Sequence, residues 1–365
     1  MLARRSQLKL PDGMPCELPL LVPSFSSKGF GYAHARGRGR SRQLSNVIVD
    51  LREFAQVASQ SVLISAYDLH FKHFDSSRDG KGSPFDSLQK SRVIFLDSGG
   101  YELAPDFDSC EPKTPSYTPR KGYGLQQYMK VLKQVAENPG HRSFVVSNFD
   151  WVTAKRPLAK QIEAARRVFQ SVPGQLTSFI LKPCSKGEHI IEPEHLSKKA
   201  FKSLAGFDVI GVTEKELGSN LLERLTHISQ LRHELDSADN PAPIHVWGGL
   251  DPIMTPLYFF AGAQIFDGVS WLRYAYESGM AVNRECFSAL SKEHGIGTDR
   301  EVCRQVISLK NRSMLNDLAS ALRTWVDGKG ADFTMFAEPI RERLHQAYKT
   351  MVTEIPQLKE VQHGR

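Results

Sequence analysis

The chain has 365 residues, of which 41% are hydrophobic and 24% are charged, and this composition supports one large α/β domain with a full core. Because no apolar run reaches the roughly 18–20 residues that a membrane helix needs, and no apolar stretch follows Arg4 and Arg5, we expect a cytoplasmic protein without a membrane segment or secretory signal. The net charge of +7 favours a polyanionic partner such as nucleic acid, although a mildly basic protein without one stays open on charge alone.

Eight short β-branched or aromatic runs predict strands. They occupy residues 18–25, 61–67, 92–97, 143–150, 178–183, 207–213, 244–249 and 264–268. Residues 123–138, 157–170 and 220–235 have an apolar residue every three or four positions, which predicts helices. Because near-continuous apolar strands alternate with helices, we expect a parallel sheet covered by helices. A count of eight strands favours closure into a (β/α)₈ TIM-type barrel.

Two segments rich in Pro, Asp, Ser and Lys interrupt this pattern, at residues 75–87 and 101–123, and predict inserted loops. After residue 273 the pattern becomes mostly helical. We therefore expect the barrel to occupy residues 1–276, and a C-terminal helical extension over residues 277–365 to pack on it.

Three aspartates stand at predicted strand ends, where the active sites of barrel enzymes form. Asp97 ends the third strand, Asp150 follows the fourth and Asp267 ends the eighth. Each would also suit a helix or turn cap, which is a common role for aspartate after a strand. Convergence of three such residues favours a site over three unrelated caps.

Glycines follow several of these strands. Gly99 and Gly100 come directly after Asp97 and Ser98, and would let a flat ligand or a phosphate approach the backbone, while Tyr101 could stack on a base. Gly211 and the pair at 248–249 are expected at the ends of their own strands.

The motifs DSGGY at 97–101, FDW at 149–151, the Gly pair after the seventh strand and FDG with a later arginine resemble the tRNA-guanine transglycosylase superfamily. The resemblance covers residues 18–276 and includes the order and spacing of the motifs. It implies that Asp267 attacks the sugar anomeric carbon, and that Asp97 exchanges a proton with the departing and arriving bases. The chain would then be a pentosyltransferase that needs no cofactor.

The same resemblance implies a base pocket and contacts to the nucleic-acid backbone. Asp150 would read the N1–H and amino edge of guanine, Ser98, Gly99, Gly100 and Gly211 would line the pocket, and Tyr101 would stack on the base. For Arg273 we expect a phosphate or sugar contact, with a surface salt bridge as the alternative. The Gly-interrupted run at 34–42 supplies Arg36, Arg38 and Arg40 as a phosphate clamp, although a solvated loop explains it nearly as well.

The five cysteines contain no CxxC pair, so we expect free thiols in a reducing compartment. Familiar members of the superfamily have a zinc cluster after the nucleophile, and this chain lacks its motif. Cys286, His294 and Cys303 stand in the equivalent region at spacings that match no standard tetrahedral site, so we expect no metal there.

Lys182, where a glutamine is usual, and the residues after Gly211 also depart from the family. A related branch inserts 7-deazaguanine bases into DNA. We therefore expect exchange of guanine for a 7-deazapurine co-substrate in DNA or tRNA, with DNA slightly favoured. The alternatives are a non-catalytic nucleic-acid-binding subunit and a barrel N-glycoside hydrolase. Homodimerisation and accessory proteins stay open.

Overall fold

The computed structural model describes most of the chain. The described residues are 1–28, 32–34, 43–45, 61–73, 88, 91–104, 106–107, 115–137, 143–151, 156–185, 188–291 and 295–363.

Eight parallel strands close into a barrel, in the order in which they occur along the chain. They are β3 (Leu20–Phe25), β6 (Ser61–Ser65), β7 (Val93–Asp97), β10 (Ser143–Ser147), β11 (Leu176–Leu181), β12 (Val209–Thr213), β13 (Ile244–Trp247) and β14 (Ile265–Gly268). Every residue of β6, β7, β10, β13 and β14 is buried, which explains their near-continuous apolar sequences. The prediction of eight strands in a (β/α)₈ barrel is confirmed.

Helices follow the barrel strands. The α-helices are α2 (Ala66–His70), α3 (Gly100–Leu103), α4 (Leu125–Glu137), α5 (Leu158–Phe169), α6 (Lys198–Ser203), α7 (Leu221–Ser237), α8 (Met254–Phe260) and α9 (Ser270–Arg273). Two 3₁₀ helices, η2 (Pro193–His195) and η3 (Glu214–Glu216), occur in the same part of the chain. The three helices predicted from periodicity are therefore confirmed as α4, α5 and α7.

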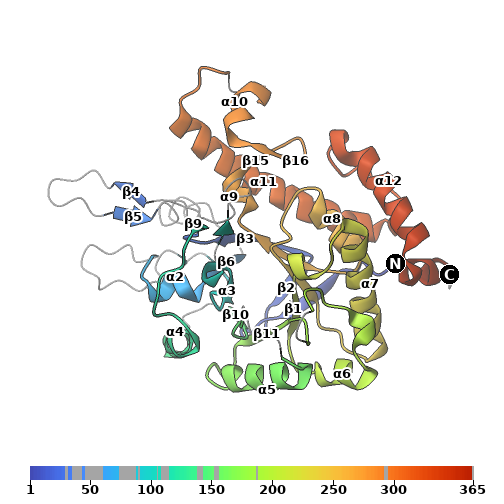
Figure 1. Ribbon diagram of the computed structural model, residues 1–365. Coiled ribbons are helices and arrows are strands. Elements are labelled where there is room, and N and C mark those ends of the chain that lie inside the picture. Colours follow the sequence, from blue (N-terminus) through green and yellow to red (C-terminus); the bar gives the residue numbers. More distant parts are fainter. Residues whose placement is uncertain are drawn as a thin grey trace. The chain divides into compact units, whose positions relative to one another are not determined.

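The chain after α9 forms a hairpin and then helices. Strands β15 (Tyr274–Glu277) and β16 (Met280–Asn283) pair antiparallel, and η4 (Arg284–Cys286), α10 (Phe287–Leu290), α11 (Arg300–Asp327), α12 (Glu338–Glu354) and α13 (Pro356–His363) follow. Figure 1 shows β15, β16 and α10 grouped at one end of α11. The tail after residue 273 is mostly helical, as expected, but residues 274–283 form a hairpin that the sequence pattern did not predict, in which Ser278 and Gly279 turn the chain with positive φ of 52° and 81°.

Among the described residues, three further antiparallel strand pairs are not part of the barrel. They join β1 (Ser6–Lys9) to β2 (Pro15–Leu18), β4 (Tyr32–His34) to β5 (Gln43–Ser45), and β8 (Asp106–Phe107) to β9 (Pro115–Tyr117). In the described part of the chain, no helix is both long and apolar enough to cross a membrane.

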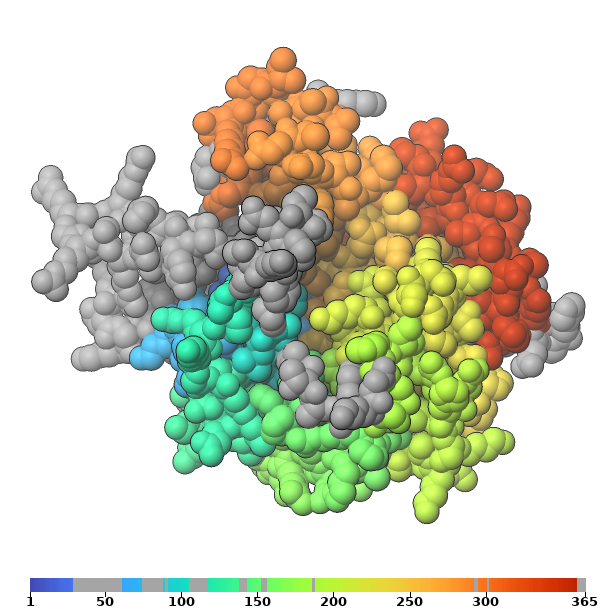
Figure 2. Space-filling view, viewed as in Figure 1, coloured from blue at the N-terminus to red at the C-terminus, as the bar shows by residue number. Residues whose placement is uncertain are grey.

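The chain divides into two compact units. The first unit comprises Met1–Pro23, Arg156–Ala159 and Leu181–Arg365, and the second comprises Ser24–Lys155 and Lys160–Ile180. In the first unit, an aromatic cluster joins Phe260 of α8 to Trp325 of α11 and Tyr348 of α12, with ring centroids 4.1 to 5.3 Å apart. In Figure 2 the surface of α12 (red) adjoins yellow residues of this unit. The C-terminal helices therefore share a core with barrel-side elements of the first unit.

Candidate active site

Asp97 is the last residue of β7 and is 7% exposed. Its Oδ2 accepts a hydrogen bond from the amide of Gly99 at 3.0 Å, so the carboxylate is held by the turn that follows its own strand. Gly99 adopts a left-handed φ of 98°, and a β-carbon there would lie 2.9 Å from both Tyr67 and Tyr123. The glycine is needed because the chain must turn sharply in a crowded place.

Asp150 lies against the same turn, as the resemblance implies. The amide of Asp150 donates to Ser98 Oγ at 2.9 Å, and a β-carbon on Gly100 would lie 2.6 Å from Asp150 Oδ2. The second unit therefore brings together all five polar or glycine positions expected there, which are Asp97, Ser98, Gly99, Gly100 and Asp150.

Tyr101 is 38% exposed in the first turn of α3. The ammonium group of Lys28, a residue 1% exposed, lies 4.3 Å from the centroid of the Tyr101 ring and donates to the Tyr101 carbonyl at 2.9 Å. The cation–π contact of Lys28 restrains the Tyr101 ring, which was expected to stack on a base. Lys28 itself was not predicted from the sequence.

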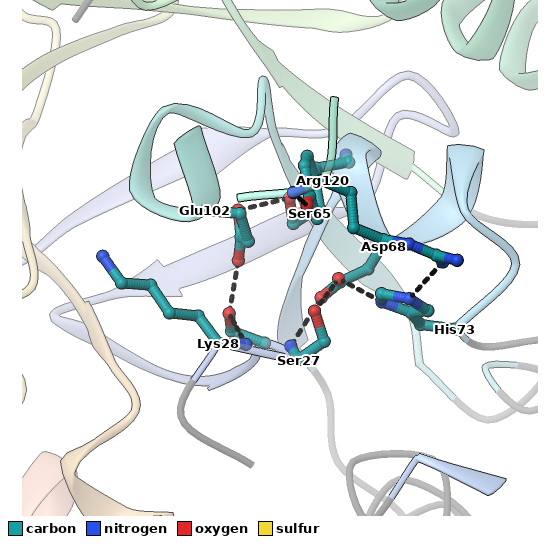
Figure 3. Close-up of polar contacts among 9 residues, drawn as sticks. Ser27, Lys28, Ser65, Asp68, His73, Glu102 and Arg120 are labelled. Carbon is teal, nitrogen blue, oxygen red and sulfur yellow. Dashed lines mark hydrogen bonds and ion pairs between the residues drawn. The ribbon is translucent and has the colours of Figure 1, made fainter. Parts of the chain in front are cut away.

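A buried polar network stands behind this turn (Figure 3). Glu102 receives hydrogen bonds from the hydroxyls of Ser26 and Ser65, and Asp68 receives them from Ser27 and from His73 at 2.9 Å. Burial, followed by the charges of Asp68 and Asp97, raises the pKa of Glu102 to about 8. Glu102 therefore carries a proton at neutral pH, close to a candidate catalytic carboxylate.

Asp267 lies in β14 in the first unit and is 5% exposed. Its Oδ1 is 3.0 Å from Nε2 of His245, in β13, and accepts from the amide of Gly248 at 3.1 Å. The main-chain carbonyl of Asp267 also accepts from the Leu250 amide at 3.0 Å. The residues directly after β13 thus donate hydrogen bonds to both the side chain and the main chain of Asp267.

Gly211 is the third of five residues in β12 and pairs in register with His245 of β13. The expectation that it ends its strand was wrong, because β12 continues to Thr213. Gly211 therefore lies beside His245, the residue that contacts Asp267.

Lys182 follows β11 and is only slightly exposed. Its ammonium group donates to Thr213 Oγ1 at 3.1 Å and pairs with Glu216 Oε2 at 2.8 Å. The residue that departs from the family pattern is therefore part of an ion pair at the end of β12.

Arg273 is exposed at the last position of α9. Arg36, Arg38 and Arg40 lie outside the described residues, as does His294. Cys286 is an exposed free thiol and Cys303 is a half-buried one.

The chain matches no family model and no curated protein. Asp97 is the last residue of β7 and Asp267 is the last but one of β14, and each buried carboxylate accepts a hydrogen bond from a main-chain amide, that of Gly99 and that of Gly248 respectively. Sequence reasoning missed His245, Lys28 and Glu102. A detectable signal existed for His245, because it is the one polar residue in the strand sequence IHVW.

Proposed function

We propose that this protein is a base-exchange transglycosylase, which replaces guanine in a nucleic acid with a 7-deazaguanine base through a covalent aspartyl-sugar intermediate. The observation that carries the proposal is the burial of Asp97 and Asp267 at the ends of two strands of one parallel barrel, each with fixed hydrogen-bond donors.

The chemistry divides between the two carboxylates. An oxygen of Asp267 bonds to the anomeric carbon as the bond from that carbon to guanine breaks, and the electron pair leaves with the base. Asp97 delivers a proton to the departing guanine and later takes one from the incoming deazapurine. The nitrogen of that base then attacks the same carbon and expels the Asp267 carboxylate, so the two displacements together preserve the original configuration.

The position of Asp150 beside Ser98 and Gly100 supports recognition of guanine. A carboxylate meets the two donors of the guanine edge, and Gly100 leaves no side chain between Asp150 and the turn. The base must leave its stack to reach such a buried site. Arg273, together with the basic run at 34–42, would contact the phosphates.

We favour DNA slightly over tRNA as the polymer, and a cytoplasmic location. The absence of the zinc motif from the sequence supports DNA, since the transglycosylase superfamily uses its zinc site for tRNA docking. The free thiols of Cys16, Cys184, Cys286 and Cys303 suit a reducing compartment.

The test is incorporation of radiolabelled guanine into duplex DNA and, separately, into tRNA. We expect label in one polymer with the wild-type protein, and a loss of at least about a thousandfold in Asp267→Asn, because the amide cannot form the covalent bond. Asp97→Asn should also lose exchange. Asp12→Asn, in the turn between β1 and β2, is the matched control and should exchange normally.

Each alternative has its own outcome. Label in neither polymer would favour a subunit that only binds nucleic acid. Release of guanine without any incoming base would favour a hydrolase. Equal incorporation by wild type and Asp267→Asn would exclude the mechanism.

A further inference from the structure

His245 is a completely buried imidazole in an otherwise apolar barrel strand. The indole of Trp247 stacks on it, with ring centroids 4.3 Å apart and planes inclined by 29°. Burying a polar ring costs free energy unless its polar atoms are hydrogen-bonded. The partner of Nε2 is the Asp267 carboxylate, which belongs to the neighbouring strand β14.

The chemistry of the two groups decides which atom carries the hydrogen. An ionised carboxylate can only accept, so Nε2 of His245 must be the donor, whatever the charge of the ring. The amide of Gly248 donates to the same oxygen, Oδ1. Oδ1 of Asp267 therefore has two donors, the imidazole of His245 in β13 and the amide of Gly248 directly after β13. The stacked indole of Trp247 limits rotation of the His245 ring.

We propose that His245 is a positioning residue for Asp267 in the exchange reaction, an inference that rests on the function proposed above. By this assignment Oδ1 stays with its two protein donors, and Oδ2 forms the bond to the anomeric carbon. Charge-assisted hydrogen bonds stabilise the free carboxylate more than the neutral ester of the intermediate. His245 therefore also favours release of Asp267 when the incoming base attacks.

If His245 positions Asp267, its loss should change the amount of the covalent aspartyl-sugar intermediate, whereas loss of a residue that only packs in the core should not. In His245→Phe the ring is kept and the donor is lost. We expect turnover to fall about tenfold to a hundredfold, the range for loss of a hydrogen bond to a charged group. The fraction of protein held as a denaturant-stable polymer adduct should rise at the same time, because the expelled carboxylate is less stabilised. His245→Gln, which can place a donor near the Nε2 position, should recover most of the turnover.

A second measurement reads the hydrogen bond without any substrate. Nitrogen-15 spectra of the histidine rings should show hydrogen on Nε2 of His245, and the chemical shift of this Nε2 should change in Asp267→Ala because its hydrogen bond to the carboxylate is lost. His73 provides an internal reference of the opposite kind. Its Nδ1 faces Asp68 at 2.9 Å, and its Nε2 lies 3.3 Å from the guanidinium of Arg120, which can only donate. His73 should therefore carry hydrogen on Nδ1.

The outcomes separate this inference from the proposed function. A wild-type protein without exchange activity would refute the proposed function, and with it the positioning role, while the spectra would still report the pairing of His245 with Asp267. An active protein whose His245→Phe variant folds, turns over normally and accumulates no adduct would overturn the positioning role alone. So would a His245 ring without hydrogen on Nε2.

Discussion

At the scale of single residues, Glu102 has the most unusual environment near the candidate site. It is 1% exposed, and its two oxygens contact the hydroxyls of Ser26 and Ser65. Burial is the largest cause that raises its pKa to about 8, and the neighbouring charges of Asp68 and Asp97 add to it. A carboxyl group of this kind is a hydrogen-bond donor at neutral pH, as well as an acceptor.

This environment predicts a pH-dependent stability. Between pH 4.5 and about 8 the folded protein keeps the Glu102 proton that the unfolded chain loses. The contribution of this proton to the free energy of unfolding is therefore complete below pH 4.5 and is lost as the pH rises through about 8. The loss is roughly 1.4 kcal/mol for each pH unit in that window. Glu102→Gln should therefore show a smaller decrease in the free energy of unfolding between pH 5 and pH 8, measured by urea denaturation.

Glu342→Gln is the matched control for this experiment, because Glu342 is exposed on α12. It should keep the wild-type pH dependence. If Glu102→Gln and wild type lost the same stability over this range, Glu102 would not hold the proton.

The residues of the site differed in how far the sequence could predict them. Asp97 and Asp267 could be predicted because each ends a strongly apolar run, and a charge there stands out. His245 could not be assigned a role, because one histidine inside a strand gives no indication of which side chain on the next strand it meets. The contact with Asp267 depends on the register between β13 and β14, which pairs His245 with Ile265.

At the scale of elements, the eight barrel strands were predictable because both faces of each are covered, which leaves long apolar runs. The hairpin β15–β16 was missed because its strands have only four residues each and stand next to clear helical periodicity. The Ser278–Gly279 pair between them is a turn sequence that could have indicated it.

One side chain of α11 holds this hairpin in place. Asn311 is completely buried, donates to the carbonyls of Trp271 at 2.6 Å and Tyr274 at 2.8 Å, and accepts from the amide of Tyr276 at 2.6 Å. Asn311→Ala removes these three hydrogen bonds, and we expect a loss of roughly 3 kcal/mol in the free energy of unfolding. Hydrogen exchange at the Tyr276 amide should also accelerate.

Asn316→Ala is the control, since Asn316 is exposed five residues further along the same helix. It should change stability by no more than about 0.5 kcal/mol. Arg273 lies between two of the residues whose carbonyls Asn311 binds, so under the proposed function Asn311→Ala should also weaken binding of nucleic acid. Unchanged exchange at Tyr276 would show that β15 is fixed by other contacts.

At the scale of the whole molecule, the question is whether the C-terminal helices are an independent appendage. They lie in the first unit with β12, β13 and β14, and Trp325 of α11 is fully buried against Phe260, Phe333 and Tyr348. Phe260 belongs to α8, the helix between β13 and β14. This shared aromatic core predicts that the helices and this part of the barrel unfold together.

Trp325→Ala tests this coupling. We expect a loss of about 3–5 kcal/mol in the free energy of unfolding, because a large buried ring is removed. Hydrogen exchange should accelerate in β13 and β14 as well as in α11 and α12, since a shared core transmits the loss. Leu309→Ala, at a position 55% exposed on the same helix, should affect neither. Faster exchange confined to α11 and α12 would instead show that the helices form a separate folding unit, and that β13 and β14 hold His245 and Asp267 in place without them.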